Sequence, residues 1–289
     1  MTRSCRGSFS LLSLLWLLPA SAFGADAPSP VLFPAAFSVE HQLVQTDASG
    51  DAFRAQPVVD TYGGTALVSV RPGGSRVIVD FAKRTVTEVR VEKSTYWTLS
   101  FSQMGDLARR LAKADERPST SSARAPSAAV RPDIRVAEVA DSGRDAFAAP
   151  SGLAGRAAAR HYRAWVESGP SADVWVDGTV RLSAAALDAL ESFERDALGS
   201  GAGSVVSPAQ LVAAARRAAG GAIPVRVKRA ISPAGGTADD VVTSLTPLAA
   251  FPQKLLAIGD GFRRVASPLE EMVAFAEDEA SRDSSRLVK

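Results

Sequence analysis

The strictest constraint on how this chain can fold is a regular alternation of apolar and polar residues between positions 76 and 101. Apolar side chains recur at every second position in three successive segments, 76–81, 87–92 and 97–101. Successive side chains of a strand point to opposite faces, so this period predicts antiparallel strands with one face on a core and the other in water. The breaks at Lys83-Arg84 and Lys93-Ser94 are short, which predicts a meander.

The same signals recur over the rest of the chain. Alternation predicts further strands at 37–44, 66–71, 134–139, 160–166, 173–177, 225–229 and 241–245. Helical spacing predicts helices from Ser102 to a point before Arg117, over about 183–197 and 207–219, and from Pro268 onward. These elements predict an α+β architecture, a large antiparallel sheet with helices inserted after groups of strands.

The first 24 residues have the layout of a secretory signal peptide. Arg3 and Arg6 precede the apolar run 11–18, and a stretch of small residues follows. The run is much shorter than the roughly 20 residues that a helix needs to cross a bilayer. We therefore expect cleavage near Ala22 or Gly24, and a soluble mature protein in the periplasm or beyond it.

Removal of this segment changes the charge and the cysteine content. The chain has 33 Lys and Arg against 31 Asp and Glu, and two of the arginines lie in the leader, so the mature protein is formally neutral. A neutral chain gives no support for a nucleic-acid partner. The single cysteine, Cys5, leaves as well, so we expect neither a disulfide nor a lipid anchor after cleavage.

Composition also divides the chain into segments. Residues 25–36 are rich in Ala and Pro and are expected to form an extended lead-in. Residues 37–282 are expected to form a single domain. Within that domain, 117–132 is rich in Ser, Ala, Pro and Arg without apolar periodicity, which predicts a flexible surface insertion. The sequence does not indicate an oligomeric state.

The sequence lacks the motifs of the common catalytic and metal sites. No G-x-S-x-G occurs, and the candidate bases His41 and His161 lie in strand patterns, where a structural role is favoured. The zinc motifs H-x-x-x-H and H-E-x-x-H are missing too. We therefore expect no enzymatic activity, no metal site and no cofactor. A hydrolase would require His161 to meet an acid and a serine in a cleft.

Five further features have structural interpretations. Asp173-x-x-x-Asp177-Gly178 lacks most ligands of a calcium loop and is interpreted as a strand closed by a tight turn. The glycine-rich segment 199–204 joins two predicted helices, so a flexible connection is favoured over a phosphate loop. Asp239-Asp240 is interpreted as a solvated loop, and Arg216-Arg217 as part of a solvated helix face. Trp97, Trp165 and Trp175 lie in predicted strands and belong either to the core or to the lining of an apolar cavity.

Several short motifs are similar to those of a known family. Residues 76–89 followed by 93–97 resemble an "i-x-D" strand that leads into "k-x-T-y-x-e", and 160–165 followed by 172–177 resemble a later "y-x-v/w" strand and the "a-x-x-W-v" strand after it. Residues 255–263 are similar to an "l-x-i-P-x-G-y" ending, with Gly259 in the place of the proline. These motifs resemble the lipoprotein-carrier-like (LolA/LolB-like) superfamily of exported bacterial proteins, or an uncharacterised secreted family close to it.

The resemblance covers most of residues 37–265 and implies a more specific fold. It implies a strongly curved antiparallel sheet, an incomplete β-barrel, with helices covering the concave side. In carrier members the concavity holds acyl chains, which implies a lipid or a lipoprotein acyl chain as the partner. The expected cavity lining, taken from the apolar phase of the strands, is Val68, Val70, Val79, Val89, Trp97, Leu99 and Val227. The alternative is a non-enzymatic structural or interaction module of the envelope, with a filled core and no small-molecule ligand.

Overall fold

The computed structural model describes residues 31–115, 133–140, 159–167, 169–198, 206–230 and 236–287. The predicted signal peptide, the predicted insertion 117–132 and the glycine-rich segment 199–204 lie outside the described residues.

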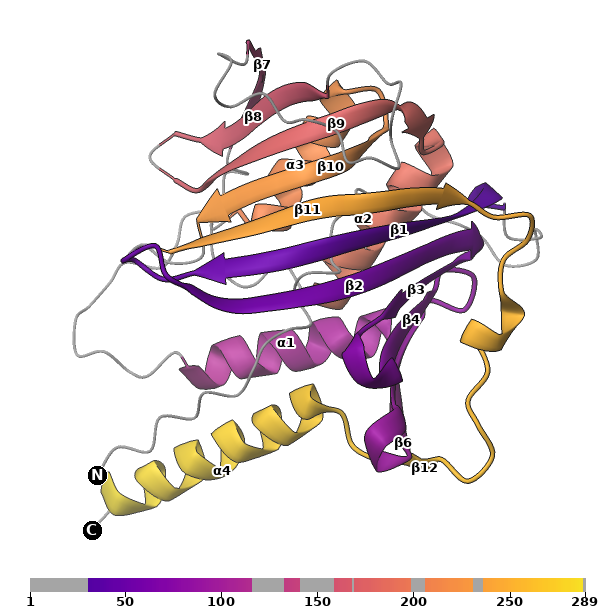
Figure 1. Ribbon diagram of the computed structural model, residues 1–289. Helices are drawn as coiled ribbons and strands as arrows, with labels where there is room; N and C mark the ends of the chain where they lie inside the picture. The colour runs from indigo at the N-terminus through magenta and orange to yellow at the C-terminus, as the bar shows by residue number, and fades with distance from the viewer. Residues whose placement is uncertain are drawn as a thin grey trace.

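The described residues form one twelve-stranded sheet (Figure 1). Its strands are β1 (Phe33–Thr46), β2 (Ala52–Gly64), β3 (Ala66–Val70), β4 (Arg76–Asp80), β5 (Thr85–Arg90), β6 (Thr95–Ser100), β7 (Ile134–Val139), β8 (Arg160–Val166), β9 (Ser171–Arg181), β10 (Ala222–Ala230), β11 (Thr237–Pro247) and β12 (Arg263–Arg264). Their order in space is β12-β6-β5-β4-β3-β2-β1-β11-β10-β9-β8-β7. Neighbouring strands are antiparallel, except that the short β12 runs parallel to β6.

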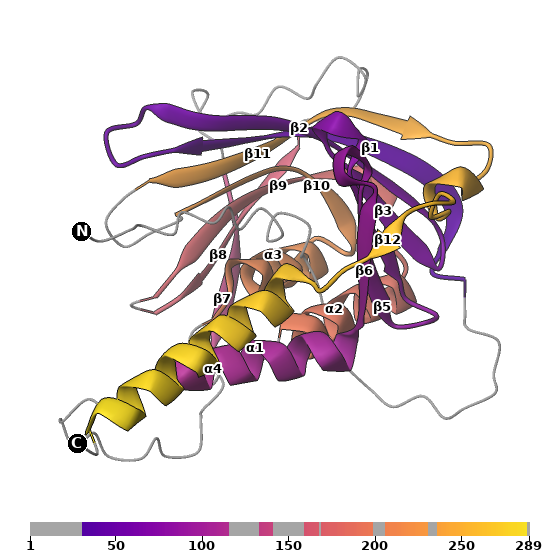
Figure 2. The same cartoon turned by 90° about the horizontal axis from the view of Figure 1, so that it is seen from below.

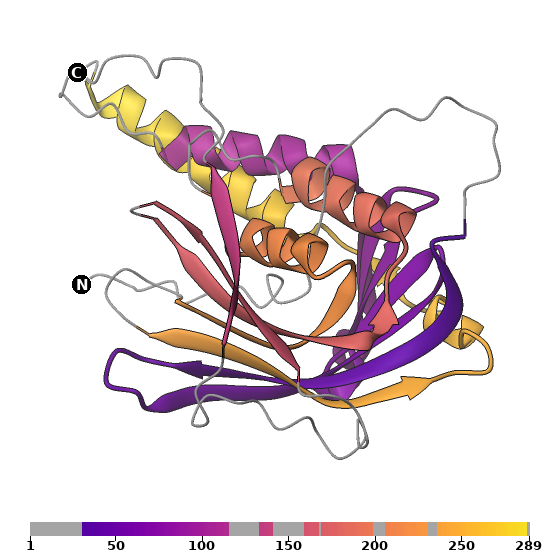
Figure 3. The ribbon, with the colours of Figure 1, turned by 90° about the horizontal axis from the view of Figure 1, so that it is seen from above.

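The sheet is curved and open, and the helices lie inside its curve (Figure 2; Figure 3). The α-helices of the described residues are α1 (Phe101–Asp115), α2 (Ala184–Leu198), α3 (Pro208–Ala218) and α4 (Pro268–Leu287). Helix α3 packs on β7 to β10, while α1 packs against both α2 and α4. The architecture is therefore α+β, with a curved antiparallel sheet covered by helices on its concave side, as predicted.

The predicted meander is confirmed as β4, β5 and β6. Val79, Val86 and Leu99 lie opposite one another on these strands and share the inner face. They are buried in the main core, together with Phe101 of α1 and Phe193 of α2. The alternation of 76–81 and 97–101 thus marks the inner face correctly, whereas the apolar phase of 87–92 points outward, with Val89 in the outer cluster, and Val86 supplies the inner position.

The outer face of the meander is not the wet face that the alternation predicted. Ile78 and Val89 are buried there in a separate cluster, together with Val68 of the neighbouring β3. Side chains of the chain segment after β11, including Phe251 and Phe262, pack against this cluster. A segment distant in sequence therefore covers a face that the local pattern assigned to solvent.

The first two strands of the described chain differ from the sequence prediction. β1 begins at Phe33, inside the predicted lead-in, because the rings of Phe33 and Phe37 pack against Tyr62 at centroid distances of 5.3 and 4.7 Å. β2 was not predicted at all. It contains Pro57 and the pair Gly63-Gly64, residues that are unfavourable in strands and obscure the alternation.

The predicted tight turn at Asp177-Gly178 is wrong, because β9 continues through it to Arg181. On the neighbouring β10, Ile223 pairs with Asp177 while Ala222 pairs with Arg181. Residues 178–180 are therefore extra residues on β9, an irregularity of the ladder larger than the single-residue insertion of an ordinary β-bulge. Gly178 therefore lies at an irregularity within β9 and not at a reversal of the chain.

Candidate functional site

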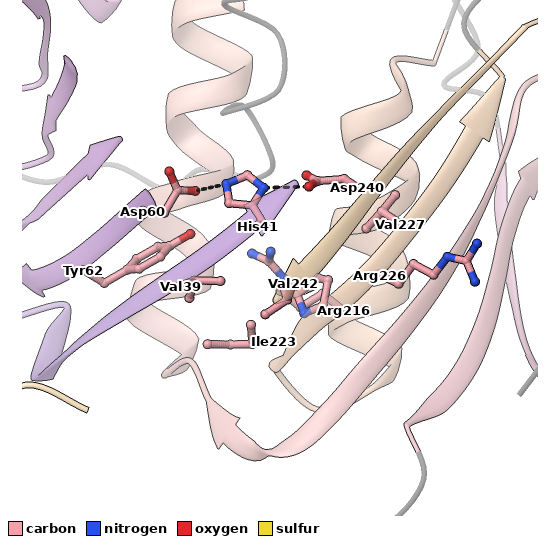
Figure 4. A pocket seen from close by; sticks show the side chains of 11 residues that line it. Val39, His41, Asp60, Tyr62, Arg216, Ile223, Arg226, Val227, Asp240 and Val242 are labelled. Carbon is pink, nitrogen blue, oxygen red and sulfur yellow. Dashed lines mark hydrogen bonds and ion pairs between the residues drawn. The ribbon is translucent and has the colours of Figure 1, made fainter. Parts of the chain in front are cut away.

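A small pocket lies on the concave face of the sheet, between the central strands and α3 (Figure 4). Its volume is about 70 Å³. Its lining comes from β1, β2, β10, β11 and α3, and consists of Val39, His41, Asp60, Tyr62, Arg216, Ile223, Pro224, Arg226, Val227, Asp240 and Val242. Apolar side chains therefore meet a group of charged ones in a single concavity.

Strand register places His41 between two carboxylates. Val39, His41 and Leu43 share the inner face of β1, because alternate residues of a strand point the same way. Asp60 of β2 lies opposite Val39, and Asp240 of β11 lies opposite Leu43. His41 sits between these two positions and so has one carboxylate on each neighbouring strand, as Figure 4 shows.

His41 is a buried cation held by this pair. Its Nδ1 atom lies 2.6 Å from Oδ1 of Asp240, and its Nε2 atom lies 3.4 Å from Oδ2 of Asp60. Burial by itself lowers the pKa of His41, but the two aspartates outweigh this effect and raise the pKa to about 11. His41 is therefore an imidazolium at neutral pH, and both ring nitrogens are donors.

Arg216 brings a second cation to the pocket from α3, and it is 7% exposed. The helix is fixed at its start by a capping box, in which Ser207 and Gln210 each accept a hydrogen bond from the other's backbone N–H. It ends before Gly220 and Gly221, which have φ of +68° and +80°. The interpretation of Arg216 as part of a solvated helix face is therefore wrong, because the helix turns it inward.

Tyr62 completes the polar part of the pocket. Burial is the main cause that raises its pKa above the ordinary value, and Asp60 acts in the same direction. The positive charge of Arg216 acts in the opposite direction. Tyr62 is therefore a neutral phenol over the whole physiological range.

Arg226 lines the pocket, but its guanidinium group points away from the pocket. Its guanidinium donates two hydrogen bonds to Asp239, at 2.9 and 2.6 Å, and lies 5.0 Å from the ring centroid of Trp175. Figure 4 shows the side chain pointing away from His41. Asp239 and Asp240 are thus adjacent residues of β11 that serve opposite faces of the sheet, and not the solvated loop predicted from the sequence.

The seven residues predicted to line one cavity fall into three hydrophobic clusters. Val79, Trp97 and Leu99 are in the main core beneath α1 and α2. Val68, Val70 and Val89 belong to the outer cluster, on the other face of the same strands. Val227 lies in the cluster beneath α3 and lines the pocket. Both faces of the sheet are buried at these strands. The alternation of apolar residues alone therefore did not show which of these residues lie on the concave face.

Trp97 is one of the predicted cavity residues that belong to the main core instead. Its indole N–H donates a 2.7 Å hydrogen bond to Glu88, and the residue is 2% exposed. Buried indole groups usually find such a partner, and the contact fixes Trp97 as a core residue. Trp175 is also buried, stacked on the ring of His161 at a centroid distance of 4.3 Å.

Sequence reasoning missed the charged part of the pocket. A signal was present, because His41, Asp60, Asp240 and Arg216 each occupy a position whose neighbours in the same phase are apolar. Use of this signal would have required a predicted strand at β2 and a predicted β11 that included Asp240. The sequence alone therefore suggested a structural histidine, and only the tertiary structure adds its two partners.

His161, the second candidate base, lies on the outer face of the sheet. Its Nε2 atom is 3.0 Å from Oδ1 of Asp173. The same carboxylate accepts two hydrogen bonds from Arg163, at 2.9 and 3.1 Å. Asp173 and the Trp175 ring together orient the imidazole, which is the role expected of a structural histidine.

Among the described residues, no three His, Asp or Glu side chains are grouped so that they could hold a metal ion. No helix in the described part of the chain has both the length and the apolar character needed to span a bilayer.

Comparison with known proteins gives structural similarities at low identity. No family model matches the chain, and no curated protein matches it. An uncharacterised conserved protein from Thermus thermophilus is similar in structure, with 7% identity, a TM-score of 0.39 and coverage of 80% of this chain and 90% of that one. A LolA-superfamily protein from Nitrosomonas europaea has 10% identity and a TM-score of 0.31, over 77% of this chain and 90% of that one.

A third similar structure is that of PNGF-II, with 8% identity and a TM-score of 0.35. The alignment covers 84% of this chain but 33% of PNGF-II, so this chain spans about a third of its length.

Proposed function

We propose that this protein is an exported carrier that binds an amphiphile, a lipid or a lipoprotein acyl chain, on the concave face of its sheet. The observation that carries the proposal is the mixed character of the pocket. Val39, Ile223 and Val242 line it with apolar side chains, while His41 and Asp60 supply charge at the same place. Such a combination suits a ligand with an apolar tail and a polar end.

The N-terminal sequence supports the location that this role requires. The leader-like segment 1–24 is typical of export, so we place the carrier in the periplasm or outside the cell. A soluble protein that moves lipid between membranes needs to cover the acyl chain, because exposed apolar surface is unfavourable in water.

The size of the pocket sets a condition on this proposal. Ligand pockets usually measure about 300–1,000 Å³, whereas this one measures about 70 Å³. An acyl chain can therefore enter only if α3 moves away from the sheet. The buried face of α3 consists of Ala209, Leu211, Val212, Ala213, Ala215 and Arg216. Moving the helix would expose Leu211 and Val212, at a cost of about 1.5–3 kcal/mol for each side chain, and burial of the ligand's acyl chain has to offset this cost.

The small volume also favours a second candidate function. A structural or interaction module of the envelope would have a filled core and would need no ligand. It predicts that the pocket keeps its present size and that α3 stays in place. The two functions differ in whether the purified protein contains lipid.

Native mass spectrometry of the processed protein, purified without detergent, tests the carrier function. We expect one or more co-purifying lipids, and displacement of a fluorescent fatty acid by natural lipids. Val227→Phe fills the pocket and should weaken binding of the fluorescent fatty acid by about tenfold or more, a loss of about 1.4 kcal/mol. Val70→Phe, the same change on the outer face, is the matched control and should bind normally.

A protein that contains no lipid and does not bind the fluorescent fatty acid would overturn the carrier function and favour the structural module. Equal binding by the two phenylalanine variants would show that any ligand lies somewhere other than this pocket.

A further inference from the structure

Two buried polar atoms of the pocket wall lack a hydrogen-bond partner among the described residues. They are Oδ1 of Asp60 and Nε2 of His41. The two residues are 8% and 6% exposed, so bulk water does not solvate these atoms. Buried polar atoms without partners are rare in proteins, because each one costs about 1–3 kcal/mol.

The two atoms have complementary hydrogen-bonding capacity. Asp60 is a carboxylate and offers an acceptor. His41 carries a proton on each nitrogen, and its Nδ1 atom is already used by Asp240 at 2.6 Å. Its Nε2 atom lies 3.4 Å from the other oxygen of Asp60, so that donor remains available for a better partner. A group that both donates and accepts a hydrogen bond can therefore satisfy both atoms.

Neither kind of ionic head group satisfies both atoms. Within the lining, the positive charges of His41 and Arg216 face the negative charges of Asp60 and Asp240, and Arg229, on the same face of β10 as Val227, adds a positive charge that interacts with Asp240. An ionised carboxylate cannot donate to Asp60 and is repelled by it, while an ammonium cannot accept from His41 and is repelled by it. Either ion should therefore bind more weakly than a neutral group that does both.

We infer that the polar end of the bound amphiphile is an uncharged group that both donates and accepts hydrogen bonds, a hydroxyl or a primary amide, held by Asp60 and His41. The inference rests on the proposed carrier function and specifies its ligand class. Both atoms are covered by the surrounding side chains, so the polar group reaches them when α3 moves to admit the acyl chain.

Four ligands with the same oleoyl chain test the inference on the full processed protein. Monoolein carries hydroxyls, oleamide carries an amide, oleate is an anion and oleylamine is a cation. We expect monoolein or oleamide to displace a fluorescent lipid probe at a concentration about tenfold lower than either ionic ligand, the ratio that corresponds to about 1.4 kcal/mol. The stronger of the two neutral ligands identifies the hydroxyl or the amide as the preferred group.

Asp60→Asn should change the binding of the neutral ligand and the binding of oleate in opposite directions. It replaces a charge-assisted hydrogen bond with a weaker neutral one and leaves the lining with a net positive charge. Binding of the preferred neutral ligand should weaken, while binding of oleate should improve relative to it. General destabilisation would weaken both ligands together. Asp239→Asn removes a carboxylate from the outer face and should leave the ligand order unchanged.

The possible failures are distinguishable. If none of the four ligands binds, the carrier function itself is wrong and the head-group inference falls with it. If oleate or oleylamine binds as tightly as the neutral ligands, the carrier function stands and the head-group inference is overturned. If Asp60→Asn does not fold, His41→Gln replaces it, and an unchanged ligand order in that variant would overturn the inference.

Discussion

Nδ1 of His41 and Oδ1 of Asp240 lie 2.6 Å apart across β1 and β11, although 199 positions separate the two residues in the sequence. Asp60 approaches the same ring from β2, on the other side. The three side chains tie together β1 and β2, the first two strands of the sheet in chain order, and β11, the last of its long strands. A charge cluster in the centre of the sheet is therefore both a link between distant segments and the wall of the pocket.

This relationship predicts a pH dependence of stability. The pKa of His41 is about 11 in the folded protein and about 6.5 in the unfolded chain. Its contribution to the free energy of unfolding is fully present below pH 6.5 and is lost as the pH rises toward 11. Between pH 7 and 9.5 this group should reduce stability by up to about 1.4 kcal/mol per pH unit.

Urea denaturation at several pH values measures this slope. His41→Gln has no titrating group at this position and should show a distinctly flatter profile over the same range. Parallel profiles for the two proteins would mean that the folded-state pKa of His41 is not raised.

The neighbours Asp239 and Asp240 should respond very differently to the same substitution. Asp240→Asn leaves the buried imidazolium of His41 with one carboxylate instead of two, and should cost about 3 kcal/mol. Asp239→Asn removes a partly exposed pair with Arg226 and should cost about 1 kcal/mol or less. Chemical denaturation of the two variants gives both values. Equal losses would contradict the assignment of the two residues to opposite faces.

Gly105→Ala should destabilise the protein even though alanine favours helices. A Cβ atom at Gly105 of α1 would clash with the backbone oxygen of Asp196 in α2. The two helices must then separate, which we expect to cost about 2 kcal/mol. Without this contact the same change would stabilise the helix by about 1 kcal/mol. The direction of the shift in thermal unfolding temperature therefore decides whether α1 and α2 cross closely here.

Gly63 and Phe251 should be energetically coupled. A Cβ atom at Gly63 would lie 2.5 Å from Cδ2 of the Phe251 ring, so Gly63→Ala should cost about 2 kcal/mol by overpacking. In the background of Phe251→Ala the same change should cost less than about 0.5 kcal/mol, because the clash is gone. A double-mutant cycle of unfolding free energies measures the difference. Additive losses would show that Phe251 does not cover β2.

Local pattern was enough to predict most of the elements of the fold. The meander from Arg76 to Ser100, the helix that follows it and the start of α4 at Pro268 are all close to their predicted places. These segments obey a period of two or of three to four residues without interruption. Their periods show where the strands and helices lie, but not which side of a strand faces the helices, because Ile78 and Val89 are buried on the outer face as well.

Prediction failed where the neighbours in space differ from the neighbours in sequence. Pro57 and Gly63 hide the alternation of β2, whose pairing with β1 and β3 stabilises it despite these residues. Val68 and Val79 carry the same apolar signal but lie on opposite faces, because the segment with Phe251 covers the outer one.

The sequence by itself determined the fold class, since periodicity is a property of consecutive residues and requires no knowledge of their partners. Only the tertiary structure decided the chemistry of the pocket. The charge of His41 depends on Asp60 and Asp240, and the inward position of Arg216 depends on how α3 packs on the sheet. Electrostatic interactions act through space, so the charge state of a buried group follows from strand register and helix packing, which this chain's local pattern does not encode.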